Sequence, residues 1–178
     1  MKNALKIIGL MVLAFVGYVA YMLINPLSPK ETVGYSSENT SFEVVYSRPY
    51  KKGRLIFGSQ EEGALVPFGK YWRTGANAAT TFETSSEIFF NGEPLKAGKY
   101  ALFTFPYEDK WTVSLNSESD VFFAISQPDP KLDVLQTSVD VKYLETPLEQ
   151  FTIEFSKDST YVKMSLMWDK TSVSIPLE

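Results

Sequence analysis

All three arginines of this 178-residue chain lie in one short stretch, which begins at Arg48 and ends at Arg73. The stretch carries six basic and two acidic residues, a net charge of +4, whereas the whole chain carries −4. A guanidinium group presents five N–H donors in a rigid fork and can hold a carboxylate or a phosphate by two parallel hydrogen bonds. The clustering therefore predicts a site that recognises an anionic ligand.

The end of this stretch supplies further groups that such a site would need. In the segment GKYWRTGANAAT, residues 69–80, Trp72 stands beside Arg73 and can offer a surface for a sugar or another ring. Thr74 and Asn77 are short hydrogen-bonding residues, and Gly75 lets backbone N–H groups come close to a ligand. The predicted ligand-binding residues are Arg48, Arg54, Trp72, Arg73, Thr74 and Asn77.

The same residues are compatible with a purely structural role. An arginine in a loop often pairs with an internal carboxylate or binds carbonyl groups at strand ends, and the chain from Thr74 onward holds 16 acidic against eight basic residues. Trp72 can close one end of a β core, and Gly75 and Asn77 are typical of turns. Whether the three arginines converge on one cleft decides between the two interpretations.

The residue types that the chain lacks exclude several kinds of chemistry. It has no cysteine and no histidine, which excludes disulfides, thiol nucleophiles, Ser-His-Asp triads and imidazole metal sites. A carboxylate-based hydrolase stays open as a less favoured alternative, but no local motif supports it. We expect no cofactor and no metal. From Glu31 onward there are 14 basic and 21 acidic residues, which argues against nucleic acid as a partner.

A hydrophobic segment precedes the rest of the chain. Residues 7–24 carry no charge, and as a helix they would be about 27 Å long, close to the thickness of bilayer hydrocarbon. Lys2 and Lys6 precede the segment, so the positive-inside rule places the N-terminus in the cytoplasm. A cleaved signal peptide is the alternative, but no good cleavage site follows. We expect a membrane anchor at residues 1–27 and a single periplasmic or extracellular domain at residues 28–178.

The rest of the chain shows the two-residue periodicity of β-strands that are buried on one face. Apolar residues alternate with polar ones at 42–47, 111–116, 151–156, 162–168 and 171–176. The run YALFTF, residues 100–105, is apolar on both faces and indicates a more central strand. Asn91-Gly92 favours a two-residue hairpin turn. Eight to ten short strands of this kind predict an all-β domain, an antiparallel β-sandwich or jelly roll.

Several segments of the domain follow one another in a characteristic order: YSRPYKKGRLIFG at 46–58, LVPFGKYWRTGANAAT at 65–80, LKAGKYALFTFP at 95–106 and WTVSLN at 111–116. In order and spacing they resemble a bacterial family called domain of unknown function 2911. The resemblance covers about residues 28–178. It implies an exported or membrane-anchored protein and marks the arginine-rich stretch as the signature of the family, but it implies no function.

The sequence therefore predicts a membrane-anchored module outside the cytoplasm that binds a small acidic or carbohydrate ligand through an arginine- and tryptophan-rich loop. The alternative is a structural or protein-interaction component of the cell envelope that has an envelope protein as its partner and no small-molecule ligand.

Overall fold

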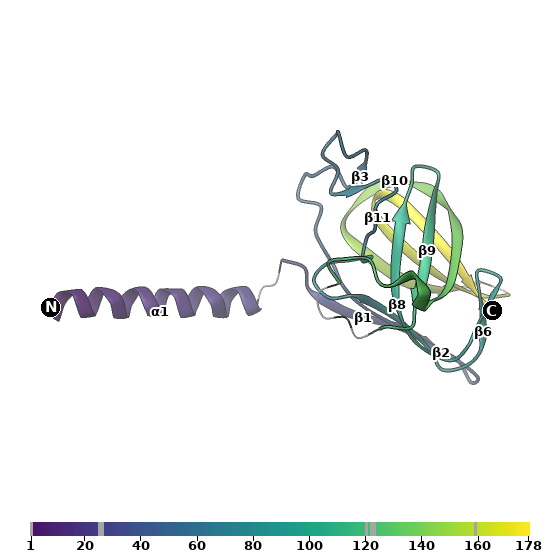
Figure 1. Ribbon diagram of the computed structural model, residues 1–178, viewed down its shortest axis with the longest axis horizontal. Coiled ribbons are helices and arrows are strands. Elements are labelled where there is room, and N and C mark those ends of the chain that lie inside the picture. The colour runs from purple at the N-terminus through teal and green to yellow at the C-terminus, as the bar shows by residue number, and fades with distance from the viewer. Residues whose placement is uncertain (1, 25–26, 120, 122–123, 159) are drawn as a thin grey trace.

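The structure is a computed structural model that describes residues 2–24, 27–119, 121, 124–158 and 160–178. One helix, α1 (Lys2–Ile24), is followed by a domain of β-strands (Figure 1). The strands are β1 (Lys30–Ser36), β2 (Ser41–Ser47), β3 (Phe57–Gly58), β4 (Val66–Pro67), β5 (Thr80–Thr84), β6 (Ile88–Phe90), β7 (Glu93–Leu95), β8 (Gly98–Pro106), β9 (Lys110–Asn116), β10 (Asp133–Lys157) and β11 (Val162–Leu177), with a 3-10 helix at Pro130–Leu132.

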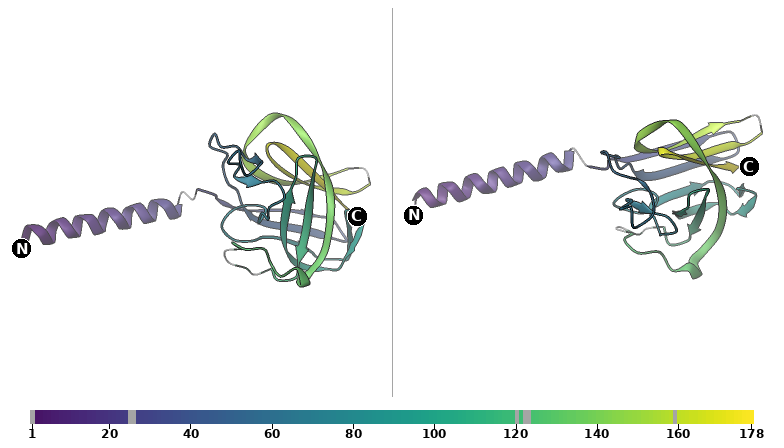
Figure 2. Two further views of the ribbon diagram at one scale, coloured as in Figure 1. Left: turned by 45° about the horizontal axis from the view of Figure 1, so that its top comes forward. Right: turned by 90° about the horizontal axis from the view of Figure 1, so that it is seen from above.

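Within the described residues, nine strands form one antiparallel sheet in the order β1-β2-β5-β8-β9-β10-β11-β6-β7, and β3 pairs with β4 in parallel. Strand β10 joins the two parts of this sheet, because its first residues pair with β9 and residues from Val141 onward pair with β11. The sheet folds over itself into two facing layers (Figure 2). Phe42 of β2 stacks on Phe155 of β10 across the layers.

The predicted antiparallel all-β class is confirmed, but the strands are arranged differently from two separate sheets of short strands. Strand β10 has 25 residues and is continuous, because register shifts between Tyr143 and Thr152 let it bend from one layer to the other. The runs 162–168 and 171–176 are one strand, β11, which passes through Asp169 at a φ of 53°.

Two local predictions are confirmed. Asn91 and Gly92 have φ angles of 51° and 82° and join β6 to β7 as a hairpin. The predicted central strand, β8, pairs with β5 and β9, and its residues 100–104 are buried one after another. The core between the layers is aromatic; its largest fully buried side chains include Trp111, Trp168 and Phe151.

Helix α1 extends away from the β domain (Figure 1), and its large apolar side chains between Ile7 and Tyr21 are exposed. Among the residues that the structure describes, no helix is both long enough and apolar enough to cross a membrane. Residues 1, 25 and 26 of the predicted anchor lie outside the described residues.

Candidate functional site

A cavity of about 620 Å³ lies where the arginine-rich stretch meets the residues that follow α1. We call it the arginine cavity. Among its described lining residues, three are basic and none is acidic. Its polar lining includes Ser28, Lys52, Arg54, Arg73 and Asn77, and its apolar wall includes Trp72 and Trp168.

The arginine cavity brings together four of the six predicted ligand-binding residues, namely Arg54, Trp72, Arg73 and Asn77. Two of the three arginines therefore share one cavity. Arg48 and Thr74 are absent from its described lining and make other contacts. Ligand binding by these residues stays a prediction.

A tight turn positions Lys52 and Arg54. Lys52 and Gly53 have φ angles of 48° and 70°, and the backbone N–H of Arg54 donates to the carbonyl of Lys51, as in a type I′ turn. Nε of Arg54 donates to the carbonyl of Lys51 at 3.0 Å, and Nη2 donates to the carbonyl of Tyr50. No described residue bonds to Nη1 of Arg54 or to Nζ of Lys52, so both groups are available to a ligand.

The loop of residues 73–77 places Arg73 and Asn77 in the lining of the cavity. Nη1 of Arg73 donates to the carbonyl of Asn77 at 2.9 Å, and Nδ2 of Asn77 donates to the carbonyl of Ser28 at 3.4 Å. Gly75 has a φ of 151°, and a Cβ there would lie 2.9 Å from the carbonyl oxygen of Ser47. The close approach of this loop to β2 therefore requires glycine.

Thr74 holds the loop to the core. It is fully buried; its hydroxyl donates to the carbonyl of Trp72 at 3.3 Å and lies 3.1 Å from the hydroxyl of Thr104. The carbonyl of Thr74 accepts a hydrogen bond from Thr80 at 2.7 Å. These contacts make Thr74 a structural residue that fixes the backbone beside Arg73.

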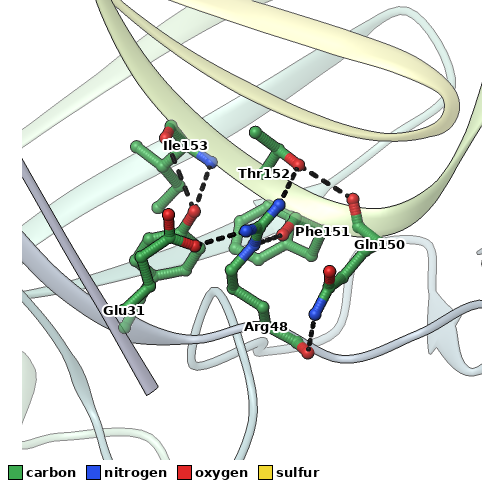
Figure 3. A network of polar contacts seen from close by, with 7 residues as sticks. Glu31, Arg48, Gln150, Phe151, Thr152 and Ile153 are labelled. Atoms are coloured by element: carbon green, nitrogen blue, oxygen red, sulfur yellow. Dashed lines mark hydrogen bonds and ion pairs between the residues drawn. The ribbon is translucent and has the colours of Figure 1, made fainter. Parts of the chain in front are cut away.

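Arg48 binds the edge of β10. Its Nε donates to the carbonyl of Phe151 at 3.0 Å, its Nη2 donates to the hydroxyl of Thr152 at 2.9 Å, and its Nη1 lies 2.5 Å from Oε2 of Glu31. Figure 3 shows the guanidinium group between Glu31 and residues 151–152. All three guanidinium nitrogens are engaged within the protein, so the structural interpretation describes Arg48.

Tyr46 binds the same edge of β10. Its hydroxyl accepts a hydrogen bond from the N–H of Ile153 at 2.9 Å and donates to the carbonyl of Ile153 at 3.4 Å. Burial raises the pKa of this phenol above its ordinary value, which keeps the donor protonated. Tyr46 and Arg48, which we call the β10 clasp, satisfy backbone groups of β10 that face away from β11.

Sequence reasoning did not predict the contribution of Trp168. Its side chain is fully buried in β11, it lines the arginine cavity, and its indole N–H has no hydrogen-bond partner among the described residues. The alternation in 162–168 placed Trp168 in the core, but no sequence signal placed it beside Arg73. Lys52 was missed too, although its place in the basic stretch could have marked it.

Comparison with known proteins agrees with the resemblance. The family model described as "Protein of unknown function (DUF2911)" matches residues 28–177, which include the whole β domain and nearly all of the cavity lining. No curated protein and no solved structure matches the chain. The chain therefore belongs to the DUF2911 family, whose function is unknown.

Proposed function

We propose that the β domain is a binding module for a small anionic ligand and that the arginine cavity is its site. The observation that carries this proposal is the charge of the lining: Lys52, Arg54 and Arg73 surround a cavity of about 620 Å³ that has no acid among its described lining residues. The surrounding chain is acidic, with a net charge of −7 from Glu31 onward. The volume lies within the range of about 300–1,000 Å³ that is typical of ligand sites.

The lining suggests how an anion would be held. Nζ of Lys52 and Nη1 of Arg54 have no partner among the described residues, so they can donate to a carboxylate or a phosphate without giving up a contact. Asn77 offers an amide, and Trp72, which is 8% exposed, supplies apolar surface for a ring. A sugar acid or a sugar phosphate combines these features.

Lys52→Gln is expected to weaken binding of an anion by about tenfold, because one hydrogen bond to a charged group is lost. Arg54→Lys is expected to weaken binding by a similar factor, because it keeps the charge but loses the rigid fork of guanidinium N–H donors. The test is isothermal titration of the full chain in mild detergent with glucuronate, glucose 6-phosphate and inorganic phosphate as probes.

The matched control is Lys96→Gln, which removes one charge at an exposed position outside the arginine cavity. It should leave the affinity unchanged. If no probe binds, or if all three variants bind like the natural chain, the site is not an anion site. The alternative of a structural or protein-interaction component would then be preferred.

We also propose that α1 anchors the domain to a membrane, with the domain on the extracytoplasmic side. The support is the uncharged run at residues 7–24 and the exposure of large apolar side chains at successive positions, among them Leu10, Met11, Val12 and Leu13. A helix that is apolar on all sides is stable where its surroundings are apolar.

If α1 is an anchor, the full chain should remain in the membrane fraction after an alkaline carbonate wash. Leu13→Arg should release most of the chain, because an arginine at the centre of a membrane helix costs about 2.5–3.5 kcal/mol. Lys131→Arg, in the 3-10 helix of the domain, is the control. Complete release of the natural chain by the wash would contradict the proposal.

A further inference from the structure

A second cavity lies next to the first. It has a volume of about 590 Å³ and shares Ser28 and Asn77 with the arginine cavity. Its remaining described lining combines two lysines with apolar or small side chains, including Lys30, Lys99, Val45, Ala78, Ala79 and Val121. We call it the lysine cavity. The hydrogen bond from Nδ2 of Asn77 to the carbonyl of Ser28 stands where the two cavities meet.

The two cavities together suit a ligand with an anionic part and an apolar part. Their described lining contains five basic residues and no acidic one. The neighbouring carboxylate of Glu31 lies 2.5 Å from Arg48 and is neutralised by it. A small sugar acid would occupy only one of two cavities of this size, whereas an amphiphile would use both.

The chain length between α1 and Ser28 places both cavities close to the end of the helix. Ser28 follows Ile24 by four residues, which span at most about 14 Å when fully extended. The polar headgroup region of a bilayer is about 5–8 Å deep on each side of the hydrocarbon. If α1 is embedded in a membrane, the wall that both cavities share is therefore held within reach of the headgroups.

We infer that the anion recognised by the arginine cavity is the phosphate headgroup of an anionic phospholipid in the membrane that α1 enters. The glycerol and the first methylene groups of the lipid occupy the lysine cavity, against Val45 and Val121. This inference rests on the proposed anion-binding function and on the proposed anchor. It identifies the ligand class by charge, by the apolar wall of the second cavity and by the short connection to α1.

The test uses the full chain in mild non-ionic detergent, with bound lipid counted by native mass spectrometry. Phosphatidylglycerol is the anionic lipid, phosphatidylcholine is the neutral comparison, and glycerol 1-phosphate and inorganic phosphate represent the headgroup free in solution. We expect one phosphatidylglycerol to be retained per chain, with little phosphatidylcholine and weaker binding of the two soluble phosphates.

Charge-matched double variants separate the cavities from non-specific attraction. Lys30→Gln with Lys52→Gln removes one cation from each cavity, and Lys96→Gln with Lys131→Gln removes two exposed cations elsewhere. The first pair should weaken retention of phosphatidylglycerol about tenfold or more, and the second should not change it.

The outcomes distinguish this inference from the proposed function. If soluble phosphates bind as tightly as phosphatidylglycerol and depend on Lys52, the anion site stands and the lipid inference is wrong. If both double variants retain phosphatidylglycerol equally, the lipid contacts only α1 or the detergent micelle, and the inference is again wrong. If none of these anions and no sugar acid binds, both proposals fall.

Discussion

Replacing Trp72 with alanine is expected to lower the free energy of unfolding by about 3–5 kcal/mol, the range for removing a large aromatic side chain from a core. Trp72 is only 8% exposed. Its ring centroid lies 4.9 Å from that of Phe151 and 5.8 Å from that of Trp168, on which it stacks. Alanine would leave a void between the loop and both partners, and the two indoles that line the arginine cavity would be reduced to one.

The hydrogen bonds of Trp72 add to this effect. Its indole Nε1 donates to the carbonyl of Gly75 at 3.1 Å, and its backbone exchanges two hydrogen bonds with Thr104 of β8, at 2.8 and 2.9 Å. The backbone pair survives substitution, so the loop should stay near β8. Loss of the indole bond leaves the carbonyl of Gly75 without that donor, which costs about 1 kcal/mol more.

The measurement is urea unfolding of the full chain followed by far-ultraviolet circular dichroism, which does not depend on the removed fluorophore. Trp72→Phe is the matched comparison, because it keeps a ring in the core and loses only the indole N–H and some volume. We expect its loss to be less than half of that for alanine. A loss below about 1 kcal/mol for Trp72→Ala would place the side chain outside the core.

Trp72 also shows where the sequence was informative and where it was not. The two-residue alternation of 42–47 and 111–116 predicts β2 and β9, because the burial of a strand on one face is a local property. The role of Trp72 depends on Trp168 and Phe151, which come from strands far along the chain. No spacing rule links these positions, so the sequence alone does not distinguish a Trp72 that stacks on a ligand from a Trp72 that packs in the core.

The length of β10 was likewise beyond prediction. The sequence marks a strand at 151–156, and residues 135–143 also alternate, but the alternation stops after Tyr143 and so does not join the two stretches. The bend between Tyr143 and Thr152 interrupts the alternation, since each register shift changes which side chains face the core. Continuous pairing with β9 and then β11 is a tertiary property, and it converts two sheets into one.

Arg48 and Arg54 have different roles for a similar reason. Arg48 and Arg54 are equivalent in sequence, because each is a cation near a turn residue in the same basic stretch. Arg48 directly follows β2, where the edge of β10 that faces away from β11 and Glu31 come within reach. Arg54 lies after the turn at Lys52 and Gly53, and among the described residues its guanidinium group bonds to the carbonyls of Tyr50 and Lys51. The role of each arginine therefore depends on the groups that the fold brings beside its guanidinium group and not on the residue type.

Replacing Arg48 with methionine is expected to lower the free energy of unfolding by about 3 kcal/mol. The change leaves the Glu31 carboxylate without its cation and removes the donors to the carbonyl of Phe151 and the hydroxyl of Thr152. Each unsatisfied group costs about 1–3 kcal/mol when it is buried. The side chains of Arg48 and Glu31 are 24% and 35% exposed, so water offsets part of this cost and the loss should stay at the low end of the range for buried pairs. Urea unfolding measures it.

A double-mutant cycle with Glu31→Gln separates the ion pair from the backbone contacts of Arg48. Because the pair is partly exposed, we expect a coupling of about 1 kcal/mol, with most of the loss remaining when Glu31 is already neutral. Arg48→Met should lower stability without weakening the binding of an anion, because it leaves the lining of the arginine cavity unchanged. Arg54→Lys should weaken binding and leave stability nearly unchanged. If Arg48→Met abolished binding in a chain that unfolds normally, Arg48 would belong to the binding site and the β10 clasp would not depend on it.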